Sequence, residues 1–255
     1  TRCHRARCRS PGWPAILADR TPKARAAPPA ADRLRGDERQ PVTSTERNAQ
    51  DFPIRETLRL YDREPLGIRL FVRARHLLCP FDRILPHVPP SGRVLDVGCG
   101  HGLFSHLMAV QSRERAVLGV DPSPTKIAVA QRVGQQLANV SFRLGTIDVV
   151  DEDDFQAITI MDVLYLLPPA EKLRLLQRCR ELIAPNGVLL LKTNDTRPRW
   201  KYWVTRTQEA LMTGLGLTHS EHGLHFFSAP ANAAVLERAG FRVQIVPLPT
   251  RLPYP

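Results

Sequence analysis

Nine residues, Val94-Leu-Asp-Val-Gly-Cys-Gly-His-Gly102, decide the fold of this 255-residue chain. They follow a short apolar run and open a segment with helical spacing, so the glycines fall in a turn between a strand and a helix. In a doubly wound α/β sheet this turn lies where ligands bind, and glycine lets the backbone approach a ligand that a Cβ atom would exclude. The motif therefore predicts a parallel sheet and the edge of it that binds a ligand.

The side chains around these glycines discriminate among nucleotide ligands. A dinucleotide-binding G-x-G-x-x-G motif needs its third glycine at position 103, which is Leu103 here, and Asp96 would repel a pyrophosphate. The same carboxylate favours a ligand with an ammonium group. A second acid, Asp121, ends the next apolar run and suits the two hydroxyls of a ribose. An ammonium group and a ribose without a pyrophosphate point to S-adenosylmethionine.

Short apolar runs alternate with helical segments over most of the chain, which is typical of a parallel sheet built from βαβ units. Strands are predicted at about 93–97, 116–120, 140–144, 156–162, 187–193 and 241–246. Helices are predicted at about 102–112, 123–137, 169–183 and 230–239. The fold class is therefore α/β, with a Rossmann-like doubly wound sheet.

The N-terminal part of the chain departs from this alternation. Residues 1–50 carry six prolines and a net charge of +6 without a hydrophobic period, which predicts a disordered leader. Residues 51–90 show apolar residues at helical spacing and are predicted to form an N-terminal helical cap. Breaks are expected near Pro65 and Pro80. A basic face of this cap, formed by Arg69, Arg73 and Arg75, is expected to be solvated.

Residues 91–255 are predicted to form the main, ligand-binding domain. Within it, the interval 194–228 interrupts the alternation and is rich in aromatic residues, threonine, arginine and histidine. We expect this interval to be a lid insert that packs over the carboxyl edge of the sheet.

The domain resembles the class I S-adenosylmethionine-dependent methyltransferases of small-molecule type. Matching segments occur in the family order: VLDVGCGHG (94–102), LGVDPS (118–123), VSFRLGTID (140–148), ITIMDVLYLLP (158–168), LIAPNGVLLLK (182–192) and HFFSAPANAAVLERAGF (225–241). The resemblance implies methyl transfer from S-adenosylmethionine. The family sheet usually has an antiparallel seventh strand between the fifth and the sixth, but Pro247–Pro255 contains four prolines in nine residues. We therefore expect the seventh strand to be missing and its position unfilled or rearranged.

The resemblance also implies a set of cofactor-binding residues: Asp96, Gly98, Cys99, Gly100, Gly102, Asp121, Pro122, Thr146, Ile147, Asp148 and Asp162. Asp96 would face the methionine ammonium, directly or through water, and Asp121 would bind the ribose hydroxyls. The adenine contact stays open between Thr146, the Ile147 backbone and Asp148. Asp162 would lie beside the transferable methyl group and either take part in catalysis or cap the loop that follows.

The acceptor is predicted from motifs that the sequence lacks and from aromatic residues that it has. An Asn/Asp-Pro-Pro-aromatic run and a Pro-Cys or Thr-Cys pair are missing, which disfavours nucleobase methylation. Aromatic residues in the lid predict a pocket for a small, hydrophobic or lipid-like acceptor, methylated on oxygen or nitrogen. Candidate acceptor contacts are Tyr165, Trp200, Tyr202, Trp203 and Phe226.

The reaction is expected to proceed without a metal ion, because the sequence does not otherwise match the magnesium-dependent catechol enzymes. His222 and His225 are candidate catalytic residues, with a plain lid or surface role as the alternative. Two alternatives to a small-molecule methyltransferase remain. The protein could methylate RNA or protein, or it could be a pseudoenzyme that binds the cofactor without turnover.

Composition limits the partners and the compartment. The chain has a net charge of +11, and more than half of the excess lies in residues 1–50, so nucleic acid is disfavoured as a partner. Five scattered cysteines form no disulfide or zinc pattern, which favours a cytoplasmic location. No apolar run reaches the roughly 18 to 20 residues that cross a bilayer, so no membrane span is expected. The oligomeric state is left open.

Overall fold

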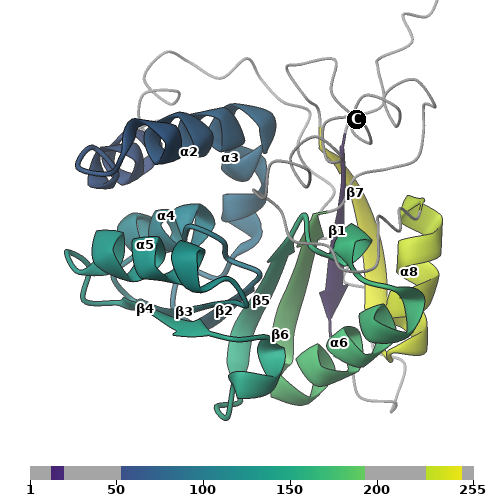
Figure 1. The fold of residues 1–255 in the computed structure, drawn as a ribbon. Helices are drawn as coiled ribbons and strands as arrows, with labels where there is room; N and C mark the ends of the chain where they lie inside the picture. Colours follow the sequence, from purple (N-terminus) through teal and green to yellow (C-terminus); the bar gives the residue numbers. More distant parts are fainter. Residues whose placement is uncertain (1–12, 20–52, 193–227, 249–255) are drawn as a thin grey trace, which may run out of the picture.

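A mixed seven-stranded sheet forms the centre of the protein (Figure 1). The computed structural model describes residues 13–19, 53–192 and 228–248. The strands are β1 (Trp13–Asp19), β2 (Gly92–Val97), β3 (Arg115–Asp121), β4 (Val140–Leu144), β5 (Phe155–Met161), β6 (Ile183–Lys192) and β7 (Arg242–Leu248). Their order in the sheet is β4-β3-β2-β5-β6-β1-β7. Strands β2 to β6 pair in parallel, as the alternating pattern predicts.

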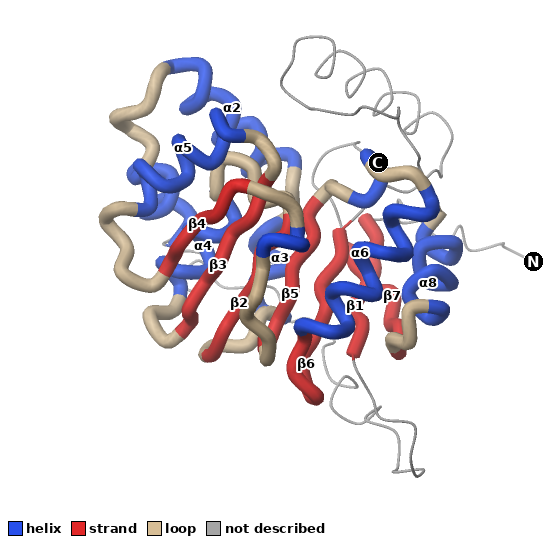
Figure 2. The backbone as a smooth tube through the Cα atoms, turned by 60° about the horizontal axis from the view of Figure 1, so that its bottom comes forward, coloured by secondary structure: helices blue, strands red, loops and turns tan. Residues whose placement is uncertain are grey.

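Helices cover both faces of this sheet (Figure 2). One face carries α4 (Leu103–Gln111) and α5 (Pro124–Gly134), and the other carries α6 (Pro169–Leu182) and α8 (Ala229–Arg238). Successive strand residues enter opposite layers: Val94 of β2 packs in the first core and Leu95 in the second. Because both faces are covered, the central strands are apolar over most of their length. The expected α/β, Rossmann-like fold is confirmed.

Two predictions about the ends of the sheet were wrong. Residues 13–19, assigned to a disordered leader, form strand β1. This strand lies between β6 and β7 and is antiparallel to both, so the sheet has seven strands and not six. The position beside β6 is not unfilled but rearranged, because a strand from the N-terminal part of the chain occupies it. The rest of the predicted leader lies outside the described residues.

Strand β1 is stable between β6 and β7 because it pairs with the facing edges of both strands. In the described part of the chain, β6 and β7 each pair with β1 on this side and not with each other, so without β1 both would present unpaired N–H and C=O groups. Ile16 and Ala18 of β1 are 0% and 2% exposed and join the core beneath α6 and α8. The alternate residue, Leu17, packs against the opposite core.

The N-terminal cap consists of a helix over 53–60, α2 (Leu66–Leu78), α3 (Phe81–Ile84) and the 3-10 turn η2 (Leu85–His87). Pro65 precedes α2 and Pro80 precedes α3, at the two predicted breaks. The cap packs on α4, where the ring of Phe81 stacks on Phe104 at a centroid distance of 5.0 Å. None of the helices in the described ranges is long and apolar enough to cross a membrane.

Candidate active site

The three glycines of the loop 98–102 have different surroundings. All have positive φ angles: 72° for Gly98, 57° for Gly100 and 82° for Gly102. A Cβ atom at Gly98 would lie 2.3 Å from Cγ2 of Val163, and one at Gly102 would lie 2.8 Å from Cε1 of His106. A Cβ atom at Gly100 would meet no described atom within 4 Å, apart from its chain neighbours. Packing therefore requires Gly98 and Gly102, whereas Gly100 borders space that none of the described residues fills.

Asp96 lies on β2, directly before this loop, and is 2% exposed. Its two carboxylate oxygens accept hydrogen bonds from Ser105 Oγ at 2.6 Å and from Thr159 Oγ1 at 2.7 Å. Burial raises the pKa of the Asp96 carboxyl above its usual range, and the two hydrogen bonds offset this effect only in part. Asp96 thus joins β2 to α4 and β5 beneath the glycine loop.

Asp121 ends β3 and holds the loop from its other side. Its Oδ2 accepts a hydrogen bond from the Gly100 N–H at 2.9 Å, and its Oδ1 accepts one from the Ser123 N–H at 2.9 Å. Each oxygen of an ionised carboxylate has two lone pairs, so acceptor capacity remains at both. The open glycine and this carboxylate are therefore parts of one site.

The remaining predicted cofactor contacts frame this site. Thr146 and Asp148 are exposed after β4, where the Thr146 hydroxyl donates to Asp148 Oδ2 at 3.0 Å, while the Ile147 side chain is buried. Ile147 opens the 3-10 turn η3 (Ile147–Val149) with its side chain in the core. Pro122 is exposed after β3, whereas Cys99 is half-buried and burial raises the pKa of its thiol.

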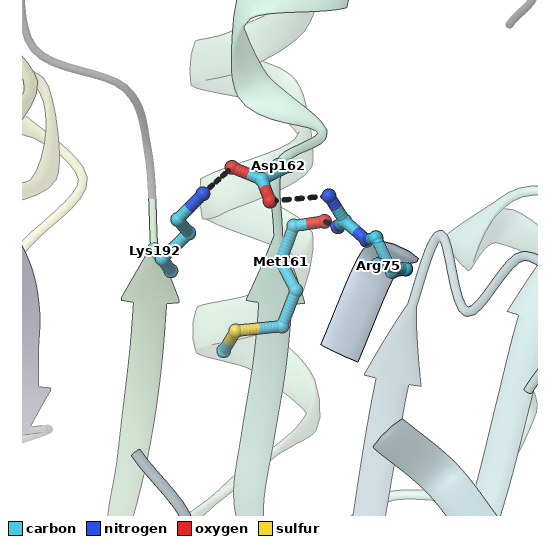
Figure 3. Close-up of polar contacts among 4 residues, drawn as sticks. All are labelled: Arg75, Met161, Asp162 and Lys192. Carbon is cyan, nitrogen blue, oxygen red and sulfur yellow. Dashed lines mark hydrogen bonds and ion pairs between the residues drawn. The ribbon is translucent and has the colours of Figure 1, made fainter. Parts of the chain in front are cut away.

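Asp162 follows β5, and its carboxylate forms ion pairs with two basic side chains from different elements (Figure 3). Arg75 of α2 approaches Oδ2 with Nη1 at 2.7 Å, and Nη2 of the same guanidinium donates to the Met161 carbonyl at 3.3 Å. Lys192, at the end of β6, places its ammonium group against Oδ1. The backbone of Asp162 has a φ of 61°, and its N–H donates to the Lys192 carbonyl at 3.0 Å. The carboxylate is therefore fixed at the carboxyl ends of two neighbouring strands.

The protonation state of Asp162 depends on its burial and on the charges of Arg75 and Lys192. Burial alone raises the pKa of the Asp162 carboxyl, but the charges of Lys192 and Arg75 and their bonds to the carboxylate lower it, and the net result is a pKa below the usual range. The Asp162 and Lys192 side chains are 3% and 2% exposed. The site thus contains a carboxylate that is ionised at neutral pH, with positive groups on both sides.

The chain can now be compared with known proteins. The sequence profile of a family described as "Methyltransferase domain" matches residues 70–245, which is more than half of the chain. The chain belongs to this methyltransferase family. Its sheet and its covering helices have the class I arrangement, and a crystal structure of a SAM-dependent methyltransferase from Aquifex aeolicus covers 75% of this chain and 89% of that one, with a TM-score of 0.51 and 17% identity.

Two curated relatives align with part of this methyltransferase. A ubiquinone biosynthesis O-methyltransferase of Xanthomonas campestris pv. campestris is 30% identical over 112 residues, which are 43% of this chain and 46% of that protein. One with the same name from Coxiella burnetii is 37% identical over 103 residues, which are 39% and 42% of the two chains. The chain therefore matches less than half the length of these relatives.

The N-terminal cap contacts the glycine loop directly. The Tyr61 hydroxyl is 2.8 Å from the His101 carbonyl, to which it donates, and 2.7 Å from Nδ1 of His106. Burial lowers the pKa of His106 to about 4. Farther along, Glu64 accepts two hydrogen bonds from Arg132 of α5, at 2.9 and 2.7 Å. The cap is thereby fixed both to the loop and to the helix that follows β3.

Three functional contacts were missed by the sequence analysis. Arg75 was grouped with Arg69 and Arg73 as a solvated basic face; this was wrong for Arg75, which turns inward to Asp162. Lys192 ends the motif LIAPNGVLLLK, and a lysine directly after four apolar residues was a usable signal for a buried cation. Tyr61 lies in a turn and gave no comparable signal.

Tyr165 is the one proposed acceptor contact that the structure describes. It lies in the 3-10 turn η4 (Leu164–Leu166) after Asp162 and is 4% exposed. Residues 194–227 of the predicted lid lie outside the described residues. So do the other predicted acceptor and catalytic residues: Trp200, Tyr202, Trp203, His222, His225 and Phe226.

Proposed function

We propose that this protein transfers the methyl group of S-adenosylmethionine to an oxygen atom of a small, hydrophobic or lipid-like acceptor. The observation that carries the proposal is the open position beside Gly100, whose N–H is held by the carboxylate of Asp121. Gly100 has a positive φ and open space beside it, and the carboxylate of Asp121 lies next to this space. Together these features can bind a ligand that carries hydroxyl groups. Membership of the methyltransferase family supports S-adenosylmethionine as that ligand.

The residues around Gly100 fit this cofactor. Asp121 retains acceptor capacity for the ribose hydroxyls. Asp96 supplies buried negative charge for the ammonium group, through water or the loop, since both its oxygens already accept hydrogen bonds. A nearby ammonium would also favour the ionised form of Asp96 and so offset the effect of burial on its pKa. Thr146, the Ile147 backbone and Asp148 remain candidates for the adenine contact.

When bound, S-adenosylmethionine supplies an electrophilic methyl group on its sulfonium. Within the chain, Asp162 is a positioning residue in this proposal, because a carboxylate with a lowered pKa is a weak proton acceptor. Its ion pairs hold Arg75 and Lys192 at the strand ends. Positive charge there favours the ionised form of an acidic hydroxyl, such as that of a phenol, and so makes its oxygen a better nucleophile.

The ion pairs of Asp162 bear on whether the reaction needs a metal ion. Two basic side chains already surround this carboxylate, so we propose that it binds no metal ion and that transfer is metal-independent.

The acceptor determines whether a general base is needed. A base for a less acidic acceptor would come from His222 or His225. The names of the curated relatives, which are O-methyltransferases of ubiquinone biosynthesis, support oxygen as the target and a hydrophobic acceptor. Trp200, Tyr202, Trp203 and Phe226, with Tyr165, are the proposed acceptor contacts.

The test is incorporation of labelled methyl groups from S-adenosylmethionine into three fractions of a cell extract: solvent-extractable metabolites, total RNA and total protein. We expect label in the metabolite fraction, no change on addition of a chelator, and much less label with the Asp121→Asn variant when the cofactor is not saturating. Label confined to RNA or protein would refute the acceptor class while preserving the reaction. Cofactor binding without turnover in any fraction would instead identify a pseudoenzyme.

A further inference from the structure

Helix α2 has a second apolar face that the cap does not bury. Leu66, Leu70 and Leu77 are 64%, 56% and 72% exposed, and they are three of the six most exposed large apolar residues in the described part of the chain. The opposite side of α2 packs normally, with Val72 1% exposed. A helix with one buried and one exposed apolar face has more apolar surface than its own fold requires.

The three leucines form a stripe along one side of α2. At about 100° per residue they fall within roughly 40° of one another around the helix axis, and at about 1.5 Å per residue they extend over roughly 16 Å, with Arg73 between Leu70 and Leu77. By the same count Arg75 lies about 160° from the centre of the stripe, which agrees with its contact to Asp162 on the inner side. The outer stripe and the inner contact are therefore on opposite sides of one helix.

Two of the three arginines of α2 lie beside the stripe. By the same angular count the half-buried Arg69 and the exposed Arg73 lie on one side of its centre, and α2 contains no acidic residue. Arg73 approaches Asp62 at 3.6 Å, with both side chains about half exposed, so this pair holds little energy and leaves the guanidinium accessible. The outer surface of α2 thus combines exposed leucines with arginines and has no acid of its own.

We propose that this surface, formed by Leu66, Leu70, Leu77, Arg69 and Arg73, docks the protein on an anionic phospholipid bilayer. An amphipathic helix with leucines on one side and basic residues at the border lies in the plane of the bilayer, with the apolar side chains among the acyl chains and the cations among the phosphates. The 13 residues of α2 suit this interfacial position and are too few to span a membrane.

Docking in this orientation would have a consequence for the site. The inner side of α2 holds the carboxyl end of β5 through Arg75, so the candidate site lies about one helix diameter, roughly 10 Å, behind the docked surface. An acceptor that resides in the bilayer would reach the site without crossing bulk water. The docking itself rests on the α2 surface alone, so its test is independent of the proposed methyl transfer.

The experiment is sedimentation of the full chain with vesicles of two parts phosphatidylcholine to one part phosphatidylglycerol, and with vesicles of phosphatidylcholine alone. We expect binding to the anionic vesicles, and binding weakened at least about tenfold by Leu70→Gln combined with Leu77→Gln. Glutamine keeps helix propensity, so α2 should stay folded. The matched control, Leu144→Gln with Ile245→Gln, removes two other exposed apolar residues and should bind normally.

A second variant tests the charge. Arg69→Gln with Arg73→Gln should weaken binding to the anionic vesicles by about fivefold per arginine at low salt, with less effect at high salt. Wild-type protein that fails to bind the anionic vesicles, or a leucine variant that binds as tightly as wild type, overturns the proposal. So does a dimer in sedimentation velocity that the leucine substitutions dissociate without any vesicle binding, because the stripe would then belong to a second copy of the chain.

Discussion

Replacing Gly100 by asparagine should separate cofactor binding from folding. The φ of Gly100 is 57°, a conformation that costs an L-residue roughly 1–2 kcal/mol and that asparagine tolerates better than most. A Cβ atom there would meet no described atom within 4 Å, its chain neighbours aside, so no packing penalty adds to the backbone cost. We expect Gly100→Asn to lower the free energy of unfolding by only about 1 kcal/mol.

Binding should respond far more strongly than stability. The new side chain would occupy the space assigned to S-adenosylmethionine and leave the carboxylate of Asp121 in place. We expect the affinity for the cofactor to fall at least tenfold, which is about 1.4 kcal/mol or more. Titration calorimetry with S-adenosylmethionine measures this loss, and urea unfolding of the same preparation measures the stability.

Gly98 provides the matched control, because its φ is also positive but its surroundings are filled. A Cβ atom there would lie 2.3 Å from Cγ2 of Val163, so Gly98→Asn adds an overpacking cost of about 1–3 kcal/mol to a similar backbone cost. The control should therefore destabilise the fold more than Gly100→Asn does. Wild-type cofactor affinity in Gly100→Asn would refute the assignment of the site, and equal destabilisation by both variants would refute the open space beside Gly100.

Three further predictions concern the strand ends and β1. Asp121→Asn should weaken cofactor binding by roughly 1.5–3 kcal/mol, the scale of hydrogen bonds to a charged group, and a calorimetric loss below tenfold would place the ribose elsewhere. The folded-state pKa of Asp162 lies below its unfolded value of about 4, so its ion pairs stabilise the fold above that pH and lose this effect as the pH falls through the folded pKa. Urea titrations at several pH values should therefore show a shallower loss of stability on acidification in Asp162→Asn than in wild type; equal slopes would contradict the ion pairs. Deleting residues 1–19 should lower the midpoint of thermal unfolding and promote aggregation through the exposed edges of β6 and β7, whereas a deletion of 1–12 that had the same effect would show that β1 is not the cause.

The elements that the sequence predicts correctly are those whose pattern is local. Strands β2 to β7 and helices α4, α5, α6 and α8 each carry their own apolar period and are bounded by glycine, proline or a cap. Strand β1 has only Ala15–Ala18 as an apolar core, between Pro14 and Asp19, which is too short for a period. Its pairing with β6 and β7 joins residues about 170 to 230 positions apart, and no local signal specifies such a contact.

The same distinction explains the site. Asp96, Asp121 and Asp162 could be placed from the sequence because each one lies within one residue of the carboxyl end of a predicted strand, and the carboxyl ends of parallel strands share one edge of the sheet. The partners of Asp162 are of two kinds. Lys192 ends a strand too, so only its role was missed, whereas Arg75 reaches the site from a separate helix, and its direction depends on how α2 packs. Helical spacing alone leaves open which side of a two-sided amphipathic helix faces inward.

The cap is therefore better regarded as a wall of the site than as a separate unit. Tyr61 and Arg75 donate to the backbone carbonyls of His101 and Met161, which belong to the glycine loop and to the end of β5. Because these acceptors are main-chain atoms, the attachment does not depend on the side chains at those two positions. A movement of the cap would consequently be transmitted to the glycine loop and to the carboxylate of Asp162. Substitutions in the cap should then alter the proposed methyl transfer while leaving every residue of the glycine motif unchanged.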